Sequence, residues 1–154
     1  DPEQYHVFEE PIRKGFERAG NGKNLSQFDI APFVTCIVGD DVEQCMMPIR
    51  ANMALYIGGM GARDKNFYND YATRLGFGDA AKKIQDLYLD GKKDEAAAAV
   101  PAELIDACHL VGPADRIKDR LQRWQEAGKQ GHVGSMLIGA GQPEALQILA
   151  ENVL

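Results

Sequence analysis

The stretch "FVTCIVGDD", residues 33–41, decides the fold. Every residue from Phe33 to Val38 is apolar or β-branched, and two aspartates follow shortly afterwards. A nearly continuous run of this kind is typical of a strand buried on both faces, as in a parallel sheet. Pro32 directly precedes this run, and proline is tolerated at the start of a strand or in an edge strand. Because Asp40 or Asp41 can cap a helix, the stretch predicts a strand followed by a helix.

Two later stretches repeat this pattern. "CHLVG" and "HVGSMLIGAG" predict brief strands over Cys108–Val111 and Val133–Ile138, and each precedes an amphipathic or apolar helix. In the helix "PADRIKDRLQRWQEAG", we expect Trp124 to lie in the core and Gly128 to cap the end. Strands separated by long helices indicate an α/β fold with about three parallel strands.

The segment between the first two strands is longer than a crossover connection needs. Its first helix carries an apolar stripe, and Pro48 inside that stripe is expected to kink or split the helix. Four more helices follow, one of them marked by Phe67, Tyr71 and Leu75. We therefore interpret residues 41–107 as an inserted helical segment within a single domain that covers residues 1–154.

Composition excludes several functions. The chain has 154 residues and a net charge of −6, which argues against a nucleic acid or an anionic membrane as partner. The apolar runs are too short to cross a bilayer, and a cytoplasmic location is expected. The three cysteines lie at wide spacings that fit neither a zinc site nor a disulfide framework. No metal site is expected.

The glycine-rich stretch "LYIGGMGARDKNFYNDY", residues 55–71, allows two interpretations. It can form a substrate pocket in which glycines let the backbone approach a ligand. It can also form a corner between helices, with positive φ at the glycines, Asn66 or Asp64 as a cap, and Phe67 in the core. We predict a structured corner, with Met60 facing the pocket. The candidate pocket residues are Gly58, Gly59, Met60, Arg63 and Lys65, the last two as cations for an anionic group.

Other candidates lie where the predicted strands end. Gly112, Gly139 and Gly141 stand between a strand and a helix, where a helix N-terminus can bind an anion, although the spacing is not that of a dinucleotide-binding loop. His109 precedes the end of the second predicted strand and is either a proton-transfer group or a structural histidine.

Three stretches carry a family resemblance. They are residues 50–106, which include "YIGGMG" and "NFY", the stretch "LVGPADRIKDRLQRWQEAG", and the closing "MLIGAG". Together they resemble the C-terminal half of the luciferase-like monooxygenase superfamily, and above all its actinobacterial oxidoreductases that use coenzyme F420. The resemblance implies the C-terminal part of a (β/α)8 TIM barrel, whose sixth, seventh and eighth strands would be the three predicted here.

The same resemblance implies a function. The intact protein would transfer hydride between coenzyme F420 and a small-molecule substrate, with an FMN-dependent monooxygenase as the alternative. The missing N-terminal half would supply most cofactor contacts and the catalytic residues, so the isolated fragment is expected to be inactive. A second hypothesis is a non-catalytic helical α/β module that forms a homo-oligomer, or associates with other chains, through open strand edges.

Overall fold

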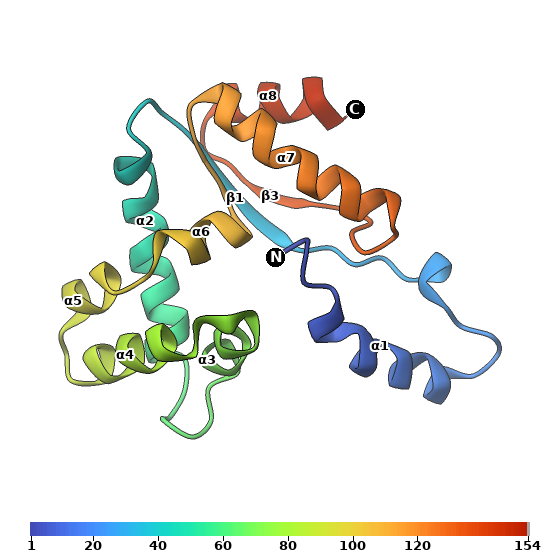
Figure 1. Ribbon diagram of the computed structural model, residues 1–154, viewed down its shortest axis with the longest axis horizontal. Coiled ribbons are helices and arrows are strands. Elements are labelled where there is room, and N and C mark those ends of the chain that lie inside the picture. The colour runs from blue at the N-terminus through green and yellow to red at the C-terminus, as the bar shows by residue number, and fades with distance from the viewer. Residues whose placement is uncertain (154) are drawn as a thin grey trace.

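A parallel three-stranded sheet lies at the centre of the computed structural model, which describes residues 1–153 (Figure 1). The strands are β1 (Phe33–Val38), β2 (Leu110–Gly112) and β3 (Leu137–Gly139). β1 is the central strand and pairs with β2 from Cys36↔Leu110 to Val38↔Gly112. It pairs with β3 from Phe33↔Leu137 to Thr35↔Gly139. The predicted α/β class, with three parallel strands, is confirmed.

The order of the strands differs from the predicted one. Consecutive strands of a TIM barrel lie side by side in chain order, which would give β1-β2-β3. The observed order is β2-β1-β3. An unpaired strand edge presents free N–H and C=O groups. In residues 1–153, β3 pairs with the edge of β1 that faces away from β2 and so satisfies these groups. This order is not that of three consecutive barrel strands, whereas the predicted α/β class with a parallel sheet of three strands holds.

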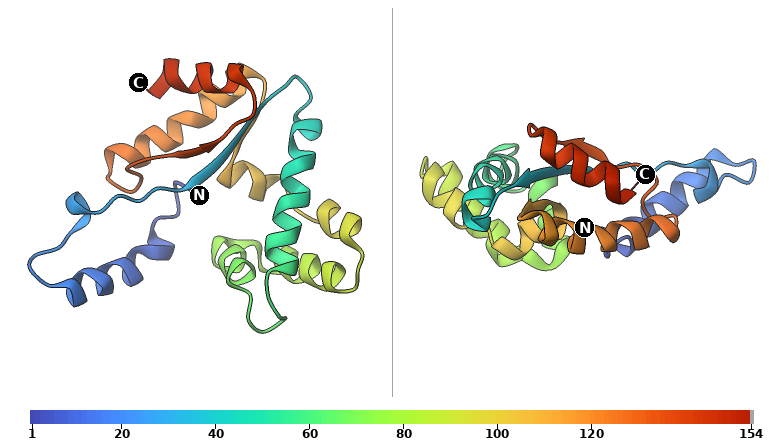
Figure 2. Two further views of the ribbon diagram at one scale, coloured as in Figure 1. Left: turned by 180° about the vertical axis from the view of Figure 1, so that it is seen from behind. Right: turned by 90° about the horizontal axis from the view of Figure 1, so that it is seen from above.

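Helices make up most of the remaining chain (Figures 1 and 2). Two π-helical turns, η2 and η3, flank the short helix α3, and a 3-10 turn, η1, precedes β1. In chain order the helical elements are α1 (His6–Ala19), η1 (Leu25–Gln27), α2 (Val42–Ala54), η2 (Leu55–Gly59), α3 (Phe67–Ala72), η3 (Thr73–Phe77), α4 (Gly78–Leu89), α5 (Lys93–Ala98), α6 (Ala102–Cys108), α7 (Ala114–Lys129) and α8 (Pro143–Val153).

The chain has two hydrophobic cores. One joins α2 to α6 and includes Met46, Ile84 and Leu104. The other packs the sheet against α7 and α8, and in it Trp124 is only 3% exposed, as predicted for a core residue. Figure 1 separates these groups, with α2 to α5 at the lower left and α7 and α8 at the top. That α2 to α6 form an insertion in a longer barrel stays a prediction.

Helix α1 forms where its apolar spacing predicts but has no buried residue. It projects from the rest of the chain in both views of Figure 2. Its rings contact Tyr71 through Phe8, at 5.2 Å between ring centroids, and Phe28 through Phe16, at 5.5 Å. Val7 packs against the core of the α2 to α6 group, whereas Phe8 lines a hollow surface.

Two predicted helix boundaries need correction. Asp41 caps α2 by accepting a hydrogen bond from the Gln44 N–H, but Pro48 does not split the helix, which continues to Ala54. Buried side chains on either side of the proline hold both halves of the helix in one core. Gly128 lies inside α7 rather than at its end, and the positive φ of +74° that follows this helix belongs to Gly131.

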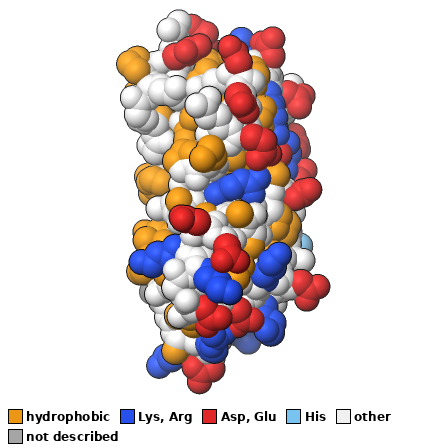
Figure 3. All heavy atoms as spheres, turned by 90° about the vertical axis from the view of Figure 1, so that its left-hand side faces the viewer, with side chains coloured by type: hydrophobic (Ala, Val, Ile, Leu, Met, Phe, Trp, Pro, Cys, Tyr) orange, Lys and Arg blue, Asp and Glu red, His pale blue; other side chains and the backbone are white. Residues whose placement is uncertain are grey.

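The side of the molecule formed by the α2 to α5 group carries mixed charges. In Figure 3, acidic and basic side chains alternate over this face and leave apolar groups between them. Interspersed charges of both signs leave no extended single-sign field on that face. In residues 1–153 no helix is long and apolar enough to cross a bilayer.

Candidate functional site

An aromatic cavity of about 930 Å³ opens between α1, the chain before β1, the end of α2, and α3. Its rings come from segments far apart in sequence, which the fold brings to one hollow. Among its lining residues are Tyr5, Phe8, Phe28, Phe33, Tyr56, Phe67, Tyr68, Tyr71, His109 and Trp124. A concave, mainly apolar hollow with a few polar groups is the usual form of a small-molecule site.

The cavity wall carries more negative than positive charge. The carboxylates of Asp1 and Asp29 line it, and none of its described lining side chains is a lysine or an arginine, so its positive charge is the amino group of Asp1. An anionic ligand group placed here would lose its hydration and meet a wall with a net negative charge. The wall therefore suits flat, uncharged molecules.

His109 stands just before β2 and lines the cavity. Its Nδ1 accepts a hydrogen bond of 3.1 Å from the backbone N–H of Thr35 in β1. Burial, with a smaller contribution from the positive amino terminus, lowers the pKa of His109 from 6.5 to about 4. The ring is therefore neutral at physiological pH. This state does not support the hypothesis of proton transfer near pH 7.

Tyr71 presents a second neutral group. Burial first, and the neighbouring Cys108 second, raise the pKa of Tyr71 to about 12. Its ring contacts Phe8 at 5.2 Å and stacks loosely with Phe67 at 6.5 Å. The phenol therefore stays protonated at any physiological pH and helps to keep this part of the wall uncharged.

The predicted roles of Phe67 and Met60 do not match their positions. Phe67 is 68% exposed and lines the cavity, so its assignment to the core is wrong. Met60 is 54% exposed and is not among the cavity-lining residues. Phe67 and Tyr71 do share one face of α3, but this face lines the cavity and is not packed into a core. The pocket role of Met60 stays a prediction.

The glycines of the corner have a packing role. A Cβ on Gly58 would lie 2.5 Å from Cβ of Tyr88, and one on Gly59 would lie 2.4 Å from Cε1 of the same ring. Neither glycine has a positive φ, so the expected left-handed conformation is wrong. Both residues instead let α4 approach η2 closely. A ligand role for these two glycines stays a prediction.

The two cations of the corner have local partners. Arg63 forms ion pairs with Asp86 and, at 3.6 Å, with Asp90. A hydrogen bond to Lys82, together with the charges of Lys82 and Arg63, lowers the pKa of the Asp86 carboxyl. The Lys65 N–H donates to the Ala62 carbonyl at 3.0 Å and closes a tight turn. These contacts explain the corner without an anionic ligand, and the predicted anion role of Arg63 and Lys65 remains to be tested.

Asn66 has a role that the sequence showed only in part. It caps α3, as one interpretation predicted, by accepting from the N–H groups of Tyr68 at 3.0 Å and Asn69 at 3.2 Å. Its amide also donates to the carbonyls of Tyr56 at 3.2 Å and Ile57 at 2.9 Å. The side chain is only 2% exposed. Asn66 thus ties η2 to α3 and fixes the wall that carries Tyr56 and Tyr68.

The loops that follow the strands are held by protein groups. Gly112 has a φ of +108°, and a Cβ there would lie 3.0 Å from Cγ2 of Val42. A Cβ on Gly139 would lie 2.8 Å from Cζ of Phe33, whereas Gly141 faces open space. Gln142 donates to the carbonyl and accepts from the N–H of Val38, both at 2.8 Å. A ligand role for Gly112, Gly139 and Gly141 therefore stays a prediction.

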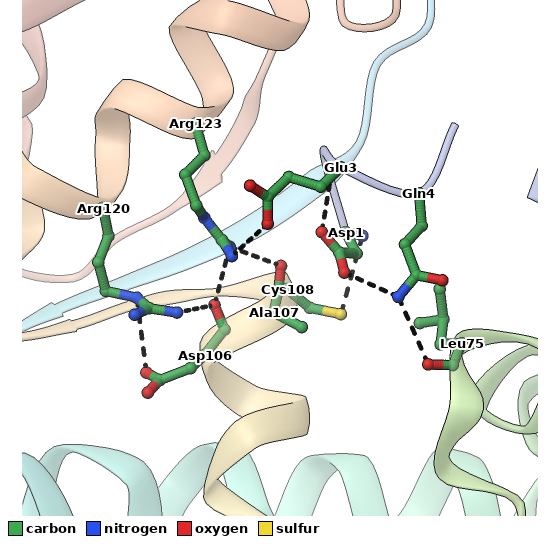
Figure 4. Close-up of polar contacts among 9 residues, drawn as sticks. All are labelled: Asp1, Glu3, Gln4, Leu75, Asp106, Ala107, Cys108, Arg120 and Arg123. Carbon is green, nitrogen blue, oxygen red and sulfur yellow. Dashed lines mark hydrogen bonds and ion pairs between the residues drawn. The ribbon is translucent and has the colours of Figure 1, made fainter. Parts of the chain in front are cut away.

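Arginines of α7 converge on the C-terminal end of α6 (Figure 4). Arg120 donates to the Asp106 carbonyl at 2.6 Å, and Arg123 donates to the same carbonyl at 3.1 Å and to that of Ala107 at 3.2 Å. Positive side chains at a helix C-terminus satisfy its free carbonyls and oppose its dipole. The cluster joins α6 to α7, which positions His109 directly after α6.

In residues 1–153 no group of three or more histidine, cysteine, aspartate or glutamate side chains is placed to hold a metal ion. The buried Cys36 lies in the sheet core.

Fold and cavity together define an α/β domain with an apolar cavity as the candidate site. The family model described as luciferase-like monooxygenase matches residues 1–131, and the chain belongs to this family. It is 32% identical, over 99% of its length, to a protein of Mycobacterium tuberculosis strain H37Rv named as a coenzyme F420-dependent oxidoreductase, Rv3520c.

A solved structure confirms the fold. The coenzyme F420-dependent tetrahydromethanopterin reductase of Methanopyrus kandleri superposes on 99% of the chain with a TM-score of 0.65 and 21% identity. The chain spans 43% of the mycobacterial protein and 42% of the reductase chain. It therefore covers less than half the length of either relative.

Proposed function

We propose that the chain is part of an oxidoreductase that transfers hydride with coenzyme F420. The observation that carries this proposal is the 32% identity, sustained over 99% of the chain, to the mycobacterial protein named for that coenzyme. The luciferase-like family match over residues 1–131 supports the same class of enzyme. When bound, the coenzyme supplies the hydride-transfer chemistry.

The described residues fit part of such a coenzyme or its substrate. Phe33, Tyr56 and Tyr68 line the cavity and can pack against a flat ring. An anionic coenzyme tail does not suit this wall, because two carboxylates line it and no lining side chain is a lysine or an arginine. We therefore infer that the tail, and most other coenzyme contacts, lie outside residues 1–153. This chain contributes an apolar wall that orients the reacting rings and excludes water.

The test compares two proteins, the isolated 154-residue chain and the longer gene product that contains it. Reduced coenzyme F420 or reduced FMN is added with a panel of small carbonyl and enone acceptors, and oxidation is followed by absorbance. We expect the longer protein to oxidise reduced coenzyme F420, and the isolated chain to show no turnover. If the longer protein oxidised reduced FMN but not reduced coenzyme F420, the proposal would be replaced by that of an FMN-dependent monooxygenase.

A further inference from the structure

The cavity contains a hydrogen-bond donor that is already oriented. Because the Thr35 N–H donates to Nδ1 of His109, this nitrogen cannot carry a proton. The ring is neutral, so its single N–H must be on Nε2. Within residues 1–153, Nε2 has no hydrogen-bond partner and is not among the fully buried unpaired atoms. It is therefore open to the cavity that the ring lines.

Trp124 lines the same cavity, but its indole N–H is fully buried and has no partner within the described residues. Nε2 of His109 is therefore the donor that a ligand in the cavity can reach. Most of the wall around it is aromatic or aliphatic, and its charged groups are the amino group of Asp1 and the carboxylates of Asp1 and Asp29.

We propose that the cavity binds a flat, uncharged molecule that carries a carbonyl oxygen, and that His109 Nε2–H donates a hydrogen bond to this oxygen. The shape follows from the aromatic wall, and the lack of negative charge follows from the two lining carboxylates, which outnumber the single positive amino group. His109 would then favour ligands with a hydrogen-bond acceptor at this position, because the backbone of β1 fixes the tautomer and the orientation of its ring.

The catalytic meaning of this selection rests on the proposed oxidoreductase function, in which the bound molecule would be the substrate. Binding itself needs no coenzyme and can be measured with the 154-residue chain. If the ketone did not bind, this inference would fail, whereas the proposed oxidoreductase function would still be decided by the turnover of coenzyme F420 with the longer protein.

Three probes of similar shape test the proposal by isothermal titration. They are methyl naphthyl ketone, isopropenylnaphthalene, in which a CH₂ group replaces the carbonyl oxygen, and naphthoate, which is an anion. We expect the ketone to bind about 5-fold more tightly than the alkene, the usual effect of one neutral hydrogen bond. Naphthoate should bind at least about 10-fold more weakly than the ketone. Equal binding of ketone and alkene, tighter binding of naphthoate, or no binding of any probe would each overturn the proposal.

Variants assign the preference to one residue. His109→Phe should remove the preference for the ketone, whereas His6→Phe, a control on the exposed face of α1, should retain it. Circular dichroism establishes that both variants fold.

A measurement on the unmodified protein does not depend on that folding. Nitrogen-detected NMR should show His109 protonated on Nε2, with a resonance that moves on addition of the ketone but not of the alkene. Protonation on Nδ1, or equal movement with both probes, would refute the assignment.

Discussion

Asn66→Ala should be among the most damaging single changes in the helical group. The alanine removes the cap of α3, which costs about 1 kcal/mol, and leaves the Tyr56 carbonyl without its amide donor, which costs roughly 1–3 kcal/mol more. The Ile57 carbonyl retains a hydrogen bond of 3.3 Å from Asn69. We expect a total loss of roughly 2–4 kcal/mol in the free energy of unfolding, or roughly 5–15 °C in melting temperature for a domain of this size.

The assay is urea denaturation followed by far-ultraviolet circular dichroism. Asn24→Ala is the matched control, because Asn24 also caps a short helix but is exposed, and its loss should cost at most about 1 kcal/mol. Asn66→Asp separates the two functions, since it keeps the capping oxygens but removes the amide donor. If Asn66→Ala lowered stability no more than Asn24→Ala does, the role of Asn66 in joining η2 to α3 would be refuted.

Three further changes test other parts of the structure. Gly58→Ala should lower stability by roughly 1–3 kcal/mol because its Cβ would meet Tyr88, whereas Gly15→Ala, in open space on α1, should have no such cost; thermal melting decides. His109 has a folded pKa of about 4, below its ordinary 6.5, so the unfolded chain binds the proton more readily and stability should fall by up to about 3 kcal/mol as pH falls from 6.5 to 4. Denaturation at several pH values should show this component in the natural protein but not in His109→Gln. Trp124→Ala should cost roughly 3–5 kcal/mol through loss of core packing, and an unchanged urea midpoint would contradict that assignment.

Local features of the fold were predictable from sequence. The β-branched run of β1 and the apolar stripe of α7 each depend on neighbouring residues, and both formed close to the expected bounds. The burial of Trp124 followed from the same helical spacing. The family resemblance added the relation to a longer barrel, which the local patterns do not contain.

Features that depend on distant contacts were not predictable. The pairing of β3 with β1 joins segments about a hundred residues apart, and no local pattern specifies which strand edge is used. The stripe that contains Phe67 shows which side of α3 is apolar but not whether another element covers that side. The neutral tautomer of His109 depends on a hydrogen bond from Thr35, 74 residues away. The sequence pointed to the glycine corner as the candidate site, which stays a prediction, whereas the aromatic cavity became visible only in the folded chain.

The most direct test of the proposed function follows the hydride itself. Deuterium-labelled reduced coenzyme F420 is incubated with the longer gene product and a neutral flat ketone, and the product is analysed by mass spectrometry. We expect the product to carry deuterium from the coenzyme, and we expect the isolated chain to form no deuterated product. Recovery of unlabelled product with the longer protein, or its formation only with reduced FMN, would contradict the account.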